Sequence, residues 1–415
     1  MKVYKFGGAS VRNAAAMLNV ASILKADNER LLVVVSAMGK TTNILERIVA
    51  LAQARQPISG EVEQLKKYHY EIVDDLLKTN TSARTGLEKF FNQIETGATN
   101  RGEYDQIYDQ VVSLGEVIST FILSHYLTEL GIENEWVDAR QFISTDSNFR
   151  EGKVDWDKTE KETEKLRDIL KRKIIITQGF IGSTSEGFTT TLGREGSDYS
   201  AAIFASCLNA DSVTIWKDVP GVMNADPKRL PAATVFEELP FREAAEMTYY
   251  GASVIHPKTI KPLANKGIPL LVKNFDDPSL SGTRIHECKI ENLPPLIVFK
   301  DNQCLISCKV TDYTFIDERH LGEIFHALNE KKIKVNMMQN SAISFSFCVD
   351  FSENKIVDLV KQLSKKFEVY YNTGLTLITI KNYDQKAFNE YRLRPGVVLE
   401  QSSRSTLQVL IKSGS

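Results

Sequence analysis

The sequence has little cysteine, little net charge and no long apolar run, and each absence excludes a class of protein. Charge is nearly balanced, with a formal net charge of -2 over 415 residues, which argues against nucleic acid or a membrane surface as the main partner. The cysteines form an odd set without zinc-type spacing, so we expect inert, reduced thiols; they are Cys207, Cys288, Cys304, Cys308 and Cys348.

The N-terminal residues 1–8 lack the apolar central stretch of a signal peptide, and no uninterrupted apolar run approaches the length of a membrane span. We therefore expect a cytoplasmic protein. With 42% hydrophobic and 25% charged residues, the composition is typical of a soluble chain of two or three domains.

The first part of the chain alternates short apolar segments with longer amphipathic ones, which predicts a mainly parallel sheet covered by helices on both faces. The expected strands are Val3 to Phe6, Leu31 to Ser36, Ile174 to Gly179, Ser212 to Lys217 and Ile268 to Lys273. The expected helices include Gly60 to Lys78, Ile107 to Leu130 and Lys158 to Lys173. Ligands of such sheets bind beyond the carboxyl ends of the strands, where Gly or Ser follows several of these segments.

This pattern breaks at Asn292-Leu293-Pro294-Pro295, which indicates a linker between a domain at 1–290 and a second region at 296–415. From about 304 to 381 the order of expected elements is βαββαβ, typical of a ferredoxin-like α+β unit. The remaining tail is too short for a second complete copy, although it could add strands.

The first candidate site is Lys5-Phe6-Gly7-Gly8-Ala9-Ser10, an expected strand that runs into glycines before a helix starting near Asn13. Paired glycines let backbone N–H groups approach a phosphate, and a helix N-terminus adds partial positive charge. A tight turn is the alternative interpretation.

Gly39-Lys40-Thr41 resembles the end of a Walker A loop, but the glycine required five residues earlier is replaced by Val34. A P-loop is therefore excluded. Ser36 and Thr42 remain candidate hydroxyl donors, or simple helix caps.

The stretch from Thr189 to Ser200 reads TTTLGREGSDYS and leads into an Ala-rich segment. Arg194 could hold a substrate carboxylate through two parallel hydrogen bonds, and Asp198 could orient an amine, a metal-bound water or a lysine. The alternative interpretation is a plain Gly-rich loop without a ligand, in which Asp198 only caps the helix that follows.

Two further positions carry candidate polar groups. Lys217-Asp218 ends an expected strand before Pro220-Gly221, and Lys228 follows soon after, so these side chains could face phosphates. Glu116 lies on an otherwise apolar helical segment, which indicates either a carboxylate that points into a pocket or an ordinary surface glutamate.

Six ordered segments together make the chain similar to the aspartate kinases of the amino-acid kinase fold. They are KFGGAS at 5–10, SLGE at 113–116, TQGFIG at 177–182, TTTLGREGSDYSA at 189–201, KDVPGV at 217–222 and GASVIHPKT at 251–259. The resemblance implies a three-layer α/β/α sandwich that uses ATP and Mg²⁺ to phosphorylate the L-aspartate β-carboxylate, the first step of lysine, threonine and methionine biosynthesis. It implies Mg²⁺ carried by ATP, without a metal site of the protein's own.

The resemblance also implies a role for each matching residue. Lys5 and Asp198 would be catalytic, and the aspartate contacts would be Thr42, Glu116, Arg194 and Ser197. ATP would be bound by Lys5, Gly7, Gly8, Ser10, Ser36, Lys217, Asp218, Met223, Lys228 and Lys258. Three departures from the family pattern affect ATP binding: Ala9 replaces a Thr, Ser253 a Lys and Lys228 an Arg.

The C-terminal region resembles an ACT region, an amino-acid-sensing module, with one unit at about 304–381 and a short tail. Its tentative regulatory residues are Asn336, Gln339, Asn340 and Ser341. In lysine-inhibited relatives the matching positions are acidic, whereas Asn336 and Ala342 occupy them here, so lysine sensing is not implied. The region would sense another amino acid or only mediate assembly into a homodimer or higher homo-oligomer.

Two alternative functions remain open from the sequence. One is another amino-acid kinase of the same fold, acting on glutamate or a derivative. The other is a non-catalytic, amino-acid-binding regulatory protein, against which the presence of Lys5, Glu116, Arg194 and Asp198 argues.

Overall fold

The computed structural model describes the chain except for residues 28, 79–80, 253–254, 292, 313 and 413–415. Part of the predicted linker, Asn292, and Ser253 therefore lie outside the described residues. The chain forms two compact units. Unit 1 comprises residues 1–222, 235–245 and 253–289, and unit 2 comprises residues 223–234, 246–252 and 290–415.

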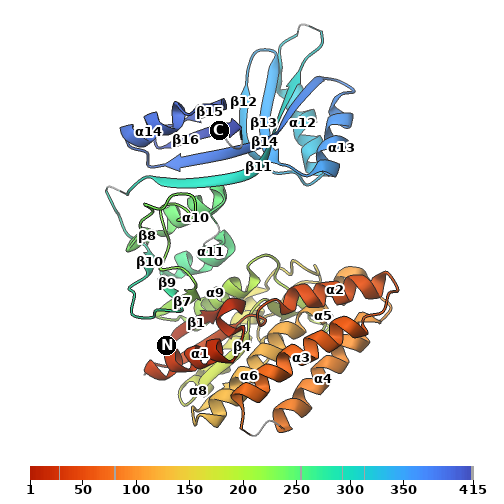
Figure 1. Cartoon of the computed structure of the whole chain (residues 1–415), viewed down its shortest axis with the longest axis vertical. Helices are drawn as coiled ribbons and strands as arrows, with labels where there is room; N and C mark the ends of the chain where they lie inside the picture. The colour runs from red at the N-terminus through yellow and green to blue at the C-terminus, as the bar shows by residue number, and fades with distance from the viewer. Residues whose placement is uncertain (28, 79–80, 253–254, 292, 313, 413–415) are drawn as a thin grey trace. The chain divides into compact units, whose positions relative to one another are not determined.

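Unit 1 is built on an eight-stranded sheet with the order β3-β4-β2-β1-β7-β9-β10-β8 (Figure 1). Its strands are β1 (Lys2–Phe6), β2 (Leu31–Val35), β3 (Asn134–Trp136), β4 (Ile174–Gln178), β7 (Ser212–Lys217), β8 (Glu238–Pro240), β9 (Leu270–Asn274) and β10 (Thr283–His286). Pairing is parallel from β3 through β9. Every residue of β2 is apolar and buried, as expected for a strand covered on both faces.

Helices cover this sheet in a three-layer α/β/α arrangement, as predicted. They are α1 (Ala14–Ala26), α2 (Thr41–Gln53), α3 (Ser59–Leu76), α4 (Thr81–Ala98), α5 (Tyr104–Val112), α6 (Leu114–Glu129), α7 (Trp156–Thr163), α8 (Leu166–Leu170), α9 (Gly196–Leu208) and α11 (Pro257–Lys266). Helix α6 packs against β2, β3 and β4, whereas α9 packs against β1, β2 and β7. A short hairpin, β5 (Ile181–Ser183) and β6 (Thr189–Thr191), precedes α9.

Two predicted helices differ from the observed ones. The helix expected at 158–173 is two short helices, α7 and α8. Between them the backbone bonds are of the 3-10 type, because the Lys165 N–H donates to the Glu162 carbonyl and the Arg167 N–H to the Glu164 carbonyl. The helix expected at 107–130 consists of α5 and α6, which meet at Ser113.

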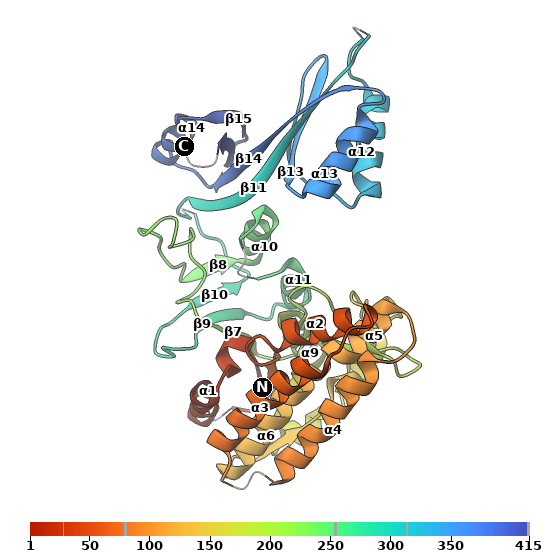
Figure 2. The same ribbon diagram turned by 45° about the vertical axis from the view of Figure 1, so that its right-hand side comes forward.

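The helical segment Tyr104–Glu129 is long and apolar enough to cross a membrane by length and composition, but 78% of its most apolar window is buried inside the protein. It is therefore a core helix of unit 1. Figures 1 and 2 both show α3, α4 and α6 running beside one another, consistent with the packing of α4 against both α3 and α6.

Unit 2 contains a six-stranded antiparallel sheet with the order β12-β13-β11-β14-β16-β15. The strands are β11 (Leu296–Lys309), β12 (Val335–Asn340), β13 (Ser344–Asp350), β14 (Glu368–Lys381), β15 (Val397–Ser402) and β16 (Thr406–Lys412). The βαββαβ order is confirmed by α12 (Glu318–Glu330) and α13 (Glu353–Leu363). Figure 2 shows that β11 and β14 are long strands that lie side by side along the whole sheet.

The tail adds β15 and β16, as the sequence indicated, and also α14 (Gln385–Arg392), which was not predicted. These elements close a second core whose buried members include Ile378, Tyr391, Leu407 and Val409. The helix α10 (Phe241–Tyr250) begins in unit 1 and ends in unit 2.

Candidate active site

Several of the predicted site residues lie at the carboxyl ends of the parallel strands of unit 1. The strand order reverses at β1, because β2 and β4 extend the sheet on one side and β7 and β9 on the other. A crevice at such a reversal is where open α/β sheets bind their ligands. Gly7, Ser36 and Gly179 follow the ends of β1, β2 and β4, and Lys217 ends β7.

Three charged side chains meet at this reversal. Lys5 Nζ lies 2.6 Å from Asp198 Oδ1, and Lys217 Nζ lies 3.5 Å from Asp198 Oδ2. Lys5 is 8% exposed and Asp198 is 3% exposed. Burial acts to raise the pKa of Asp198, but the charges of Lys5 and Lys217 outweigh it and hold the pKa below its ordinary value. The carboxylate is therefore ionised, and the three groups together carry one net positive charge.

Local structure explains how these three residues meet. Lys5 and Lys217 lie on β1 and β7, which pair directly in parallel. Asp198 lies in the first turn of α9, where the helix dipole favours a negative charge. The residue before α9, Glu195, has a left-handed backbone with φ of 53°, an uncommon conformation for a residue with a side chain.

The glycine pair after β1 is packed against the loop that follows β2. A Cβ atom added to Gly8 would lie 2.6 Å from the Ala37 carbonyl oxygen, and the Gly39 N–H donates to the Gly8 carbonyl at 3.0 Å. Only glycine therefore fits at position 8 without movement of the neighbouring loop. Ser10 is buried in the short 3-10 helix Gly8–Val11.

Glu116 is a buried carboxylate rather than a surface group. It lies in the first turn of α6, is 3% exposed, and its Oε1 accepts a hydrogen bond from the Ala37 N–H at 3.3 Å. Its Oε2 atom is buried and has no hydrogen-bond partner among the described residues. Burial raises the pKa of Glu116 to about 8, against the opposing effects of the Ala37 N–H and the Lys5 charge. Such a group is suited to accept a cationic ligand.

Ser197 lies against the end of β4. A Cβ atom added to Gly179 would lie 2.5 Å from Ser197 Cβ, so the glycine allows α9 to approach the sheet closely. The Phe180 N–H donates to the Ser200 hydroxyl at 2.9 Å, which anchors the same turn of the helix.

Two predicted substrate residues and one predicted nucleotide residue remain available for ligands. Arg194 is exposed, and its guanidinium makes no hydrogen bond or ion pair within the described part of the chain. Thr42 is half-buried in the first turn of α2, and Ser36 is half-buried at the end of β2, where its carbonyl accepts from the Ser119 hydroxyl. Neither hydroxyl caps α2, because its N-terminal capping residue is Lys40 and makes no side-chain cap bond.

The structure does not bring all predicted nucleotide residues together. Asp218 is exposed after the end of β7, and Lys258 Nζ lies 3.8 Å from where a Gly193 Cβ atom would be. Met223 and Lys228 belong to unit 2, so their assignment to the nucleotide site stays a prediction.

The tentative regulatory residues lie on β12 and the turn after it. Asn336 bonds to Lys300, Gln303 and Asp350 within unit 2. Gln339 and Asn340 are exposed, and the Ser341 hydroxyl bonds to Ser344. Their regulatory role stays a prediction.

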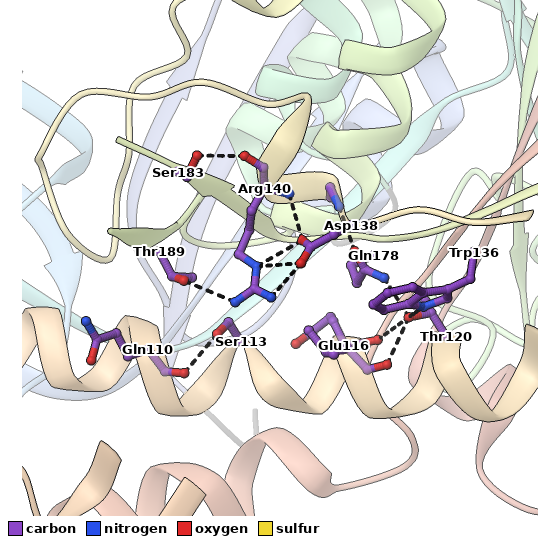
Figure 3. Close-up of polar contacts among 12 residues, drawn as sticks. Gln110, Ser113, Glu116, Thr120, Trp136, Asp138, Arg140, Gln178, Ser183 and Thr189 are labelled. Carbon is purple, nitrogen blue, oxygen red and sulfur yellow. Dashed lines mark hydrogen bonds and ion pairs between the residues drawn. The ribbon is translucent and has the colours of Figure 1, made fainter. Parts of the chain in front are cut away.

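Sequence reasoning missed several residues that support the site from behind. Asp109, on α5, and Gln178, at the end of β4, are buried polar groups bonded to neighbouring segments. Gln178 links the Thr120 hydroxyl to the Ala139 N–H (Figure 3). The sequence shows each of them only as a single polar residue in an apolar segment. Surface residues produce the same pattern, so it does not identify a buried polar group. Figure 3 shows that Ser113, Glu116 and Thr120 lie on the side of their helix that faces Arg140, Gln178 and Thr189.

No cluster of three or more His, Cys, Asp or Glu side chains that could hold a metal ion occurs among the described residues. Asp198, the one deeply buried carboxylate of the charged cluster, is already engaged by two lysines.

Comparisons with known proteins identify the family of the chain. Residues 1–274 match the model of the amino acid kinase family. Lysine-sensitive aspartokinase 3 of Escherichia coli is 33% identical over 400 residues, covering 92% of this chain and 87% of that protein. A chloroplastic bifunctional aspartokinase/homoserine dehydrogenase of Arabidopsis thaliana is 32% identical over 90% of this chain, which spans 42% of that longer protein. The crystal structure of E. coli aspartokinase III in complex with aspartate and ADP superposes with a TM-score of 0.83 at 30% identity, covering 99% of this chain and 96% of that one.

Proposed function

Because this chain belongs to the aspartokinases of the amino acid kinase family, we propose that Lys5, Asp198 and Lys217 form its phosphoryl-transfer centre and that Glu116 and Arg194 hold its substrate. The chain is an aspartate kinase: it transfers the γ-phosphoryl group of ATP to the β-carboxylate of L-aspartate, giving 4-phospho-L-aspartate, the first step toward lysine, threonine and methionine.

The reaction needs charge compensation more than proton transfer. A side-chain carboxylate is ionised at pH 7 and is already a nucleophile, so no general base is required. One carboxylate oxygen forms a bond to the γ-phosphorus, the bond between that phosphorus and the bridging oxygen breaks, and ADP leaves with the electron pair. The enzyme must offset the repulsion between the two anions.

The buried ion-paired cluster supports this role for Lys5. Its ammonium group is fixed by Asp198 beside the glycine loop, and the cluster keeps one positive charge after pairing. A preorganised charge in a buried site stabilises a developing negative charge far more than it would in water. Lys5 would therefore neutralise the transferring phosphoryl oxygens, while Asp198 positions both lysines.

The substrate would be held by its α-amino and α-carboxylate groups. Among the described residues, one Glu116 carboxylate oxygen has no partner and would accept from the ammonium group. The Arg194 guanidinium likewise has no partner there and would donate two parallel bonds to the α-carboxylate. Ser197 and Thr42, each half-buried at a helix start, would complete the contacts. The unpartnered Glu116 oxygen in a buried site is the observation that carries this assignment.

ATP would lie over the same strand ends. Gly7, Gly8, Ser10 and Ser36 would line the phosphate path, with Lys217 and Asp218 at the end of β7 and, as predictions from the resemblance, Met223, Lys228 and Lys258. Mg²⁺ bound to the ATP phosphates would neutralise part of the polyphosphate charge.

The test is hydroxamate formation from aspartate, MgATP and hydroxylamine by the purified protein, compared with the Lys5→Ala and Glu116→Gln variants. We expect product with aspartate and not with glutamate, and its loss in Lys5→Ala. Product with glutamate alone would favour another amino-acid kinase, and no product from folded protein that binds ATP would favour a regulatory protein.

For unit 2 we propose an effector-binding or assembly role within a cytoplasmic homodimer or higher homo-oligomer. The similarity to a lysine-sensitive aspartokinase supports an amino-acid effector. Asn336 carries no charge for a lysine ammonium group, so lysine, threonine and methionine should each be tested as inhibitors, with sedimentation to measure the oligomer.

A further inference from the structure

Asp109 is a buried carboxylate that plays no part in the proposed chemistry. Its side chain is 0% exposed. Its Oδ2 accepts from the N–H groups of Arg150 at 2.8 Å and Thr191 at 2.9 Å, and its Oδ1 accepts from the Thr191 hydroxyl at 2.7 Å. Burying a carboxylate without an ion pair costs free energy. The three hydrogen bonds offset part of that cost, and they hold the donor groups in place around Asp109.

The two segments that Asp109 holds both adjoin Arg194. Thr191 is the last residue of β6, and only Leu192 and Gly193 separate it from Arg194. Arg150 has a left-handed backbone with φ of 67°, and its carbonyl oxygen lies 3.2 Å from where a Gly193 Cβ atom would be. Asp109 therefore fixes the strand before the Arg194 loop and also the chain segment behind it.

Asp109 and Glu116 lie on the same helical rod. Ser113, between α5 and α6, keeps helical dihedral angles, with φ of -56° and ψ of -27°. Seven residues correspond to almost two helical turns, so both carboxylates are on one face, about 10 Å apart along the axis. That face is turned toward the β6 residue Thr189, as Figure 3 shows for Ser113 and Glu116.

We propose that Asp109 is a positioning residue that sets the separation between Arg194 and Glu116, and thereby selects substrates with an α-carboxylate and an α-ammonium group on one carbon. The inference rests on the proposed function, in which Arg194 and Glu116 bind these two groups. The helical segment that contains α5 and α6 carries Glu116, which would accept from the substrate ammonium group. Through Asp109 the same segment holds the backbone of the loop that carries Arg194, which would donate to the substrate α-carboxylate.

The experiment is a double-mutant cycle with Asp109→Asn and Arg194→Ala. The KM for aspartate, the KM for ATP and kcat are measured for the wild type, both single variants and the double variant. Asp109→Asn removes the negative charge and one of the two acceptor oxygens, so the charge-assisted bonds to the two N–H groups and the Thr191 hydroxyl cannot all be kept. We expect the KM for aspartate to rise by about 10- to 100-fold in Asp109→Asn, as for other small displacements of a binding group. We expect the KM for ATP to stay within about twofold.

In the Arg194→Ala background, Asp109→Asn should have almost no further effect on the KM for aspartate. Inhibition by succinate, which has both carboxylates, should weaken in Asp109→Asn. Inhibition by β-alanine, which lacks the α-carboxylate, should not change. Thr191→Val, which removes only the hydroxyl donor, should give a smaller change in the same direction and serves if Asp109→Asn folds poorly.

Asp105→Asn is the matched control, because Asp105 lies on the same helix but is exposed and pairs with the Arg150 side chain at 3.3 Å. It should leave all three constants unchanged. Additive effects in the double variant, or equal rises in both KM values, would overturn the proposal. An Arg194→Ala variant with an unchanged KM for aspartate would instead refute the proposed role of Arg194.

Discussion

Lys5 and Asp198 form a 2.6 Å ion pair between two almost completely buried side chains that lie far apart in the sequence. Removing two charges from water costs several kcal/mol for each ion, and a single pair seldom repays it fully. The second lysine, Lys217, adds attraction to the same carboxylate and leaves the cluster with one surplus positive charge. Under the proposed function, this surplus charge is available to bind phosphate groups.

Replacement of Lys5 by Met should lower kcat by about 10²- to 10³-fold, as when other preorganised charge-stabilising groups are removed. It should also lower the free energy of unfolding by up to about 3–5 kcal/mol, because Asp198 loses its nearer partner in a buried site. Hydroxamate assays and urea unfolding measure the two effects. Adding Asp198→Asn should restore much of the stability but none of the activity.

The control for that prediction is Lys2→Met on the same strand. Lys2 pairs with Asp27 at 3.1 Å, and their side chains are 32% and 13% exposed, so this pair is better solvated than the Lys5–Asp198 pair and should contribute less. We expect Lys5→Met to lower the free energy of unfolding more than Lys2→Met does. Equal losses in the two variants would contradict this prediction.

Glu116 should make aspartate binding depend on pH. Its pKa of about 8 means that the free enzyme carries a proton there at pH 7, whereas an ammonium ligand requires the ionised carboxylate. The KM for aspartate should therefore fall as the pH rises from 6 to 8, and aspartate binding should release a proton. Calorimetry in buffers of different ionisation enthalpy measures that proton. Glu116→Gln should raise the KM for aspartate and abolish both effects.

The same residue should change the pH dependence of stability. Because the folded pKa is raised from 4.5 to about 8, the stabilising contribution of protonated Glu116 is complete below pH 4.5 and is lost as the pH rises to 8. Above pH 8, Glu116→Gln should have a higher Tm than the wild type, and the difference should shrink toward pH 4.5. A Tm difference that does not vary with pH would contradict the raised pKa.

Gly179→Ala should displace Ser197, because the added methyl group would lie 2.5 Å from Ser197 Cβ. We expect kcat/KM for aspartate to fall by about 10²-fold, with a folded protein by circular dichroism. Gly60→Ala is the matched control, since a Cβ atom at this helical position meets nothing within 4 Å. That variant should be neutral or slightly more stable. Full activity in Gly179→Ala would remove Ser197 from the site.

A chain that ends after residue 382 should be insoluble or aggregate on expression. The truncation removes α14, β15 and β16, and so exposes the edge of β14 and the buried side chain of Ile378. The milder variant Val409→Asp places a charge in the same core, where Val409 is 0% exposed, and should lower Tm by several degrees. Gln401→Asp, at an exposed position of β15, should have little effect. A soluble, stable truncated chain would show that the tail is dispensable for folding.

The central strands could be predicted from sequence because a short, continuous apolar run favours a buried strand over a helix or a loop. Leu31–Val35 is a continuous apolar run, and its observed bounds differ from the predicted ones by a single residue. The break between α7 and α8 could not be predicted, because its residues Glu164 and Lys165 are polar and suit a helix as well as a turn. Likewise, the length of β14 depends on pairing with β11 and β16 rather than on its own residues.

Candidate site residues could be predicted only where they lie within a recognisable sequence motif. Lys5 and Asp198 lie in recognisable segments, but the contact of Lys217 with Asp198 requires the pairing of β1 with β7, which no local pattern indicates. Asp109 was missed because a single Asp among apolar helix residues is usually a surface group, and its partners lie in two later segments.

The position of β1 in the middle of the sheet also determines when the cluster of Lys5, Asp198 and Lys217 can form during synthesis. β1 pairs with β7 through residues 212–216, so one of its two edges stays unpaired until these residues have been made. Lys5, Asp198 and Lys217 can meet only after that strand has been added. A nascent chain therefore cannot assemble this charged cluster before β7 has been made, and until then one edge of β1, a mostly buried strand in the folded protein, stays unpaired.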